Sequence, residues 1–156
     1  LIRWQRWQRP GSSRASMPWV ERKVAVSSVV DPASARYCES FEPSHSRHAD
    51  AASLADHLGI SAAPVRMDSQ AKYAVVARGE AEAYLRLPRD QAYREKIWDQ
   101  AAGSIIVEEA GGMVTDLNGK ELDFSRGRTL RENRGICASN GRLHADALAA
   151  LKAVNA

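Results

Sequence analysis

Short segments rich in β-forming residues alternate along this chain with longer segments whose apolar residues recur at helical spacing. Glycines separate many of these segments. The helical period predicts helices over 49–58, 69–78, 99–110 and 140–154. The β-type segments predict strands over 23–30, 37–41, 65–67, 81–87, 113–115 and 135–138. The helix over 99–110 has apolar residues that we expect on its buried face: Ala101, Ala102, Ile105, Ile106 and Ala110. This alternation predicts a layered α/β domain.

The first 22 residues differ in composition from the rest of the chain. They contain three of the four tryptophans, set among arginines and glutamines, and they have no helix or strand period. We interpret residues 1–22 as a disordered or mis-assigned terminus and residues 23–156 as the domain. The alternative for this terminus is an Arg/Trp segment that stacks on bases or contacts a membrane surface.

The net charge of +3 is unevenly distributed. The first 23 residues hold six Arg or Lys side chains and one Glu, which is +5 there and leaves −2 for the remainder. A mildly acidic domain is a poor binder of nucleic acid. No run of about 18 or more apolar residues is available to cross a membrane. We therefore expect a small-molecule substrate, and neither a nucleic acid nor a membrane as partner.

Two cysteines, Cys38 and Cys137, are too few for a disulfide framework. We interpret both as reduced thiols, which indicates an intracellular protein, either cytoplasmic or organellar.

Asp99 is the first candidate for chemistry, in the stretch Trp98-Asp-Gln-Ala-Ala-Gly103. Two interpretations of Asp99 stay open from the residues alone. The carboxylate caps the start of the helix, which is its commoner use, or it points outward as a hard oxygen ligand for Mg²⁺. The small residues that follow would let a phosphate approach the N-terminus of the helix closely.

Ser69, Lys72 and Arg86 are candidates for a phosphate cradle, because the first two lie one helical turn apart and the third is on the next strand. A capping serine with a surface lysine and arginine explains them equally well. His45 and His48 have a spacing that would allow transition-metal binding, but a solvated loop is the simpler interpretation.

Several longer motifs occur in an order that resembles one known family. They are Cys38-Glu-Ser, Glu42-Pro-Ser-His-Ser-Arg-His48, Asp68-Ser-Gln-Ala-Lys-Tyr73, Tyr84-Leu-Arg-Leu-Pro88, Tyr93-Arg-Glu-Lys-Ile-Trp-Asp-Gln-Ala-Ala-Gly103, Glu109-Ala-Gly-Gly112, Leu122-Asp-Phe124 and Gly127-Arg-Thr-Leu130. Together they resemble the 3′(2′),5′-bisphosphate nucleotidases of the inositol monophosphatase superfamily. The resemblance covers about residues 24–150 and implies the C-terminal α/β domain of an αβαβα sandwich, without its N-terminal half.

The resemblance implies a Mg²⁺-dependent phosphomonoester hydrolase that acts in sulfur metabolism and nucleotide detoxification. The family removes the 3′-phosphate of adenosine 3′,5′-bisphosphate to give AMP, accepts sulfated nucleotides, and is commonly inhibited by lithium or sodium. By the same resemblance Asp99 would bind Mg²⁺ at the phosphate to be cleaved. Four residues would bind the nucleotide and its retained phosphate: His45, Ser69, Lys72 and Arg86. Lys96 would help to orient this region.

The chain departs from the family in its metal ligands. The family takes the other ligands from an N-terminal half, which contains a Glu and an Asp-Pro-Ile/Leu-Asp-Gly-Thr motif. Asp31-Pro32 is followed here by Ala-Ser-Ala, so it is not that motif. Because one carboxylate seldom holds Mg²⁺ against water, we expect the chain alone to be inactive. We also expect it to lack the layers that would bury one face of its sheet, and so to be marginally stable. The alternatives are a non-catalytic nucleotide-binding remnant and an inositol phosphate phosphatase of the same superfamily.

Overall fold

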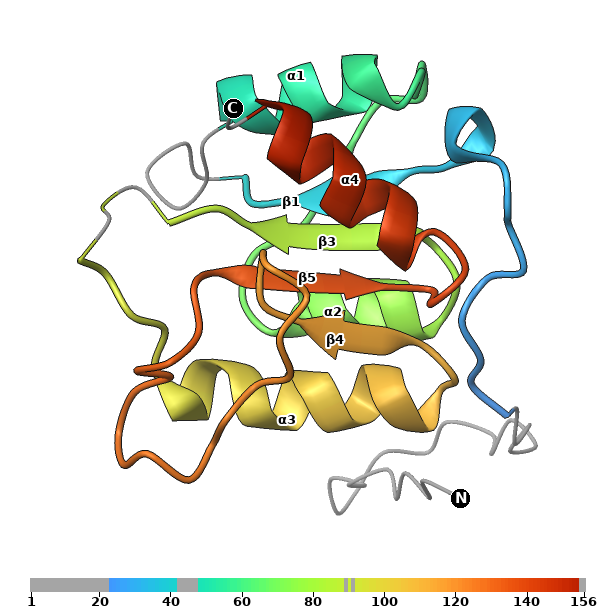
Figure 1. Cartoon of the computed structure of the whole chain (residues 1–156). Helices are drawn as coiled ribbons and strands as arrows, with labels where there is room; N and C mark the ends of the chain where they lie inside the picture. Colours follow the sequence, from blue (N-terminus) through green and yellow to red (C-terminus); the bar gives the residue numbers. More distant parts are fainter. Residues whose placement is uncertain (1–22, 42–47, 89, 91, 155–156) are drawn as a thin grey trace, which may run out of the picture.

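The computed structural model describes residues 23–41, 48–88, 90 and 92–154. In chain order the elements are η1 Pro32–Ser34, β1 Tyr37–Glu39, α1 His48–His57, β2 Val65–Arg66, α2 Ala71–Ala77, β3 Ala83–Arg86, α3 Ile97–Glu109, β4 Met113–Thr115, β5 Ile136–Ser139 and α4 His144–Val154. The strands form a sheet between two helical layers, with α1 and α4 on one face and α2 and α3 on the other (Figure 1). The predicted layered α/β fold is confirmed. The expected terminus 1–22 lies outside the described residues.

The sheet is mixed, and within the described residues its strand order is β2-β1-β3-β5-β4. β1 pairs in parallel with both β2 and β3, whereas β5 runs antiparallel to β3 and to β4. Consecutive parallel strands need long connections, and α1 and α2 serve as these connections. β3 is therefore a central strand that helices cover on both faces.

Each face of the sheet has its own hydrophobic core. Tyr84 and Ile136 point toward α2 and α3, where they pack with Val75, Val76 and Val107. The next residues along the same strands, Leu85 and Cys137, point to the opposite face and pack against α1 and α4. Successive residues of a strand face opposite sides, so both sides of β3 are buried. The expectation that one face of the sheet lacks a covering layer is therefore wrong for the described residues.

The predicted strand over 23–30 is wrong, because these residues form no strand of the sheet. The backbone is held instead by the buried amide of Asn140, which donates to the carbonyls of Ser27 and Val29 at 3.4 and 2.8 Å. Val26 N–H donates to Ala110 carbonyl at 3.0 Å. The β-type residues of this segment therefore run alongside the domain and do not pair within a ladder.

The predicted buried face of α3 is confirmed only in part. Ile106 and Ala110 pack against the core, whereas Ala102 and Ile105 are exposed. The fully buried residues of the helix are Gln100, Gly103, Ser104 and Val107. Gly103 lies directly against the ring of Tyr73 in α2, so closely that a β-carbon there would overlap the ring. Because α2 and α3 are in close contact, the side of α3 with small and polar residues faces α2. Larger apolar side chains would not fit there.

Both cysteines are free and buried, as expected of reduced thiols. None of the helices in the described part of the chain has the length and apolar character needed to cross a membrane.

Candidate functional site

Asp99 lies in the first turn of α3, and its side chain is exposed. The helix begins at Ile97, two residues earlier than the sequence predicts. Lys96 occupies the N-cap position with extended backbone and makes no side-chain capping bond. The interpretation of Asp99 as the N-cap is therefore wrong. An exposed carboxylate in the first turn is stabilised by the helix dipole and remains available as an oxygen ligand to a hard cation.

The turn before α2 lies beside the first turn of α3. The side-chain amide of Gln70 donates a hydrogen bond to the backbone carbonyl of Asp99. This contact places Ser69, next in sequence to Gln70, close to the start of α3. Two sequence motifs about 30 residues apart thus come together at one end of the α2–α3 layer.

Ser69 has a positive φ of 63°, which is uncommon for a residue other than glycine. Its hydroxyl is exposed and accepts a hydrogen bond from Ala71 N–H at 3.3 Å. Gln70 rather than Ser69 occupies the N-cap position of α2, so the expected capping serine is wrong by one position. The Asp68 carboxylate instead accepts from Ser40 Oγ at 2.6 Å and from Phe41 N–H at 3.1 Å, which fixes the turn to the end of β1.

Lys72 is buried, with 5% of its surface exposed, so its interpretation as a surface lysine is wrong. Its ammonium lies 5.4 Å from the centroid of the Tyr84 ring, which is cation–π distance. Burial lowers the pKa of Lys72, and the nearby Arg86 charge lowers it further, whereas Cys38 and Asp68 oppose the shift. Two cations that repel each other at one end of the sheet form a site suited to an anion.

Arg86 is the last residue of β3, and its guanidinium is one-quarter exposed. Its Nε lies 3.1 and 3.0 Å from the two carboxylate oxygens of Glu95, which is 2% exposed. Glu95 also accepts from Gln100 Nε2 at 2.8 Å, and Gln100 Oε1 accepts from Tyr73 OH at 2.6 Å. The carboxylate of Glu95 keeps the pKa of Arg86 above its ordinary value despite partial burial.

The sequence did not reveal Glu95, Gln100 or Tyr73 as site residues. Glu95 lies in a polar stretch where a buried residue is not expected, and only the fold brings it to Arg86. Lys96 is half-buried, and its backbone bridges to Thr129. His45 lies outside the described residues. His48 begins α1, and the pairing of these two histidines is not described.

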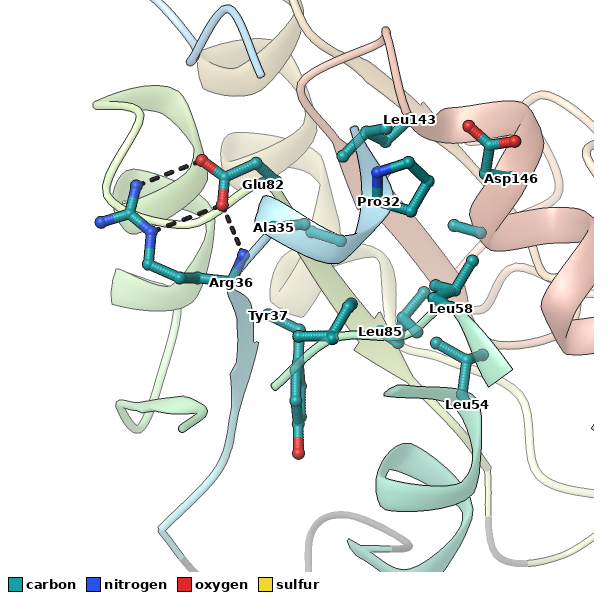
Figure 2. Close-up of a pocket in the computed structure, with 13 residues that line it drawn as sticks. Pro32, Ala35, Arg36, Tyr37, Leu54, Leu58, Glu82, Leu85, Leu143 and Asp146 are labelled. Carbon is teal, nitrogen blue, oxygen red and sulfur yellow. Dashed lines mark hydrogen bonds and ion pairs between the residues drawn. The ribbon is translucent and has the colours of Figure 1, made fainter. Parts of the chain in front are cut away.

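A small hollow lies on the other face of the sheet (Figure 2). Apolar side chains of α1, α4 and β3 line it, including Leu54, Ala147 and Leu85, and Glu82 at its edge is paired with Arg36 at 3.1 Å. Its volume is about 20 Å³, enough for a water molecule and far too small for a nucleotide. The candidate site is therefore the cationic end of the α2–α3 layer.

Solved structures of similar shape give the class of fold. An inositol monophosphatase from Anabaena (Nostoc) sp. superposes with a TM-score of 0.60 at 25% identity, over 83% of this chain and 48% of that one. The mixed sheet and its two helical layers are thus those of an inositol monophosphatase fold.

Sequence comparison narrows the class to a family. The inositol monophosphatase family matches residues 6–156, and the chain belongs to this family. A 3′(2′),5′-bisphosphate nucleotidase from Emericella nidulans is 48% identical over 133 residues, which are 85% of this chain and 38% of that protein. One from Oryza sativa is 50% identical over 131 residues, which are 84% of this chain and 36% of that protein. The chain spans little more than a third of the length of these relatives.

Proposed function

We propose that the chain is the C-terminal, nucleotide-binding part of a Mg²⁺-dependent 3′(2′),5′-bisphosphate nucleotidase. The whole enzyme would remove the 3′-phosphate of adenosine 3′,5′-bisphosphate and release AMP. The observation that carries this proposal is the contact of Gln70 with Asp99, which brings the Ser69–Lys72 turn to the turn that holds the candidate metal ligand. High identity to relatives named as bisphosphate nucleotidases supports the choice of substrate class.

The residues present fit a magnesium site only in part. Asp99 offers one exposed carboxylate, and within the described residues no three His, Cys, Asp or Glu side chains gather to hold a metal. Mg²⁺ requires near-octahedral oxygen ligation and keeps its water unless several ligands or phosphates help. We therefore propose that Asp99 supplies one ligand and that the substrate and the remainder of the enzyme supply the others. The metal, when bound, would activate water and neutralise phosphoryl charge.

The cationic residues of this chain have a separate task. Arg86 and Lys72 would bind the phosphate that is retained in AMP, since a guanidinium held at the Nε edge can still offer its terminal nitrogens to two phosphate oxygens. Ser69 would add a hydroxyl at the edge of the same site. His45 remains part of the proposal from the family resemblance alone.

The outer face of α3 supports the proposal that the rest of the enzyme packs there. Trp98 and Ile105 of α3 are 56% and 52% exposed. Exposed apolar groups of the size of Trp98 and Ile105, one above the other on the outer face of α3, indicate a surface that another part of the protein covers. We propose that the occupant is the N-terminal half of the same enzyme.

The test uses a chimera in which the 133 aligned residues of this chain replace their counterparts in the Emericella nidulans relative. We expect Mg²⁺-dependent release of phosphate from adenosine 3′,5′-bisphosphate at a rate at least about tenfold above that from inositol 1-phosphate, because a buried cationic site favours a substrate with a second phosphate. The opposite preference would favour the alternative of an inositol phosphate phosphatase. A folded chimera that binds nucleotide and hydrolyses neither compound would favour the non-catalytic remnant.

A further inference from the structure

Glu95 is a buried carboxylate to which the proposed reaction gives no role. Both of its oxygens lie within 3.1 Å of Arg86 Nε, and it is among the largest fully enclosed side chains of the described residues. Burial raises its pKa, while Arg86 and Gln100 oppose this shift and Asp99 adds to it. A buried charge needs such partners, so Glu95 and Arg86 hold each other in place.

The contact continues by hydrogen bonds into both helices of the layer. Gln100 donates to Glu95 at 2.8 Å, and Tyr73 of α2 donates to Gln100 at 2.6 Å. Gln100 is also the residue next to Asp99 in the first turn of α3. The network therefore joins the end of β3, where Arg86 lies, to the turn that carries Asp99.

We propose that Glu95 is a positioning residue that sets the spacing between Arg86, at one phosphate of the substrate, and Asp99, at the other. It would do so by holding the Nε edge of Arg86 and, through Gln100, the first turn of α3. This inference rests on the proposed nucleotidase function. It also narrows the substrate class to nucleotides whose two phosphates match that fixed spacing.

The charge of Glu95 and its position predict opposite effects on anion binding. If Glu95 acted only through its negative charge, its neutralisation would strengthen the attraction of Arg86 for a phosphate. If Glu95 positions Arg86, its neutralisation weakens binding, because the guanidinium must then be ordered when the ligand arrives. The sign of the change in affinity therefore separates the two roles.

The experiment is a calorimetric titration of the 156-residue chain and its Glu95→Gln variant with AMP and with adenosine. The amide keeps the shape of the carboxylate but has one acceptor oxygen for two donors, Arg86 Nε and Gln100 Nε2. We expect the affinity for AMP to fall about 3- to 10-fold and the affinity for adenosine to stay the same. The matched control is Glu80→Gln, which breaks the exposed pair of Glu80 with Arg78 at 2.7 Å and should change neither affinity.

Glu95→Asp is the second variant, since it keeps the charge and withdraws it by one methylene. A purely electrostatic role would leave AMP affinity unchanged in this variant, and the positioning role predicts a loss of similar size. Equal or tighter AMP binding by folded Glu95→Gln or Glu95→Asp, when the wild-type chain prefers AMP to adenosine, would overturn the inference and leave the proposed function standing. A wild-type chain with no preference for AMP would overturn both.

Discussion

His144, at the start of α4, is a histidine that the fold holds neutral. Thr115 donates its hydroxyl to the Asp116 carbonyl at 2.8 Å, so Thr115 Oγ1 accepts from His144 Nε2 at 2.9 Å. Ser139 Oγ accepts from Gly141 N–H at 3.0 Å and donates to His144 Nδ1 at 2.8 Å. The ring therefore carries its proton on Nε2, and burial lowers its pKa below the ordinary 6.5.

The stability of the domain should therefore fall in mild acid. The pKa of His144 is lower in the folded chain than in the unfolded chain, so protonation favours the unfolded chain. The contribution of neutral His144 to stability is fully present above pH 6.5 and is lost as the pH falls below that value. The free energy of unfolding should decrease by up to about 1.4 kcal/mol for each pH unit below that value, until the folded pKa is reached. Urea unfolding of wild type and His144→Gln between pH 5 and pH 7.5 measures this, and the variant should lose most of the slope. The exposed His57 is the control, and a His57→Gln chain that lost the slope instead would contradict the assignment.

At the scale of the secondary-structure elements, the close contact of α2 with α3 supports the candidate site. Gly103 has no side chain at the point where α3 meets the Tyr73 ring, and Tyr73 OH is the far end of the hydrogen-bond network to Arg86. The spacing of the two helices is therefore coupled to the position of the guanidinium.

Gly103→Ala should destabilise the domain. Alanine is the better helix former by about 1 kcal/mol, but its β-carbon would overlap the Tyr73 ring, and overpacking of this kind costs about 1–3 kcal/mol or more. We expect a net loss of about 1–2 kcal/mol in chemical denaturation and a weaker affinity for AMP. Ala102→Ser, at the exposed neighbouring position of α3, should change stability by less than about 0.5 kcal/mol. Equal stability of the two variants would mean that the helices do not meet at Gly103.

The elements themselves were largely predictable, because local signals determine them. The helix over 49–58, for example, ends before Gly59, whose φ of 71° is the left-handed conformation that glycine adopts easily. The buried face of α3 was predictable only in part from its apolar period, since Ile106 and Ala110 pack against the core but Ile105 lies on the outer side. Residues 23–30 form no strand, and a distant side chain, Asn140, binds the carbonyls of Ser27 and Val29 instead.

The candidate site was predictable in its residue types and not in its geometry. Residue type and spacing made Ser69, Lys72, Arg86 and Asp99 candidates, and the family resemblance gave them roles. Neither gives burial. Lys72 is buried where α2 meets Tyr84 of β3, and Arg86 pairs with Glu95, which lies nine residues further on between β3 and α3. Tertiary contacts of this kind carry no local signal, and for that reason Glu95 was missed.

On the scale of the whole molecule, the outer surface of α3 is uncovered and includes Trp98 and Ile105. We propose that the remainder of the enzyme covers it. Ile105→Glu should change the stability of the isolated chain by less than about 0.5 kcal/mol, because the side chain is exposed there.

In the chimera the same substitution should lower the free energy of unfolding by about 2–4 kcal/mol, because it would bury an unpaired charge. Thermal unfolding of both proteins measures the difference. Ala149→Glu, at an exposed position of α4 in the opposite layer, should be neutral in both. A neutral Ile105→Glu in the chimera would place the remainder of the enzyme elsewhere.

The central claim is that this chain supplies Asp99 and a nucleotide site to an enzyme whose other metal ligands lie outside it. The most direct measurement is the rate of phosphate release from adenosine 3′,5′-bisphosphate, with and without Mg²⁺, by the chain alone, the chimera and its Asp99→Asn variant. We predict no turnover by the chain, multiple Mg²⁺-dependent turnovers by the chimera, and a loss of at least about 100-fold in Asp99→Asn, which would correspond to roughly 2.7 kcal/mol of transition-state stabilisation. Multiple turnovers by the chain alone, or an Asp99→Asn chimera as active as its parent, would contradict the account.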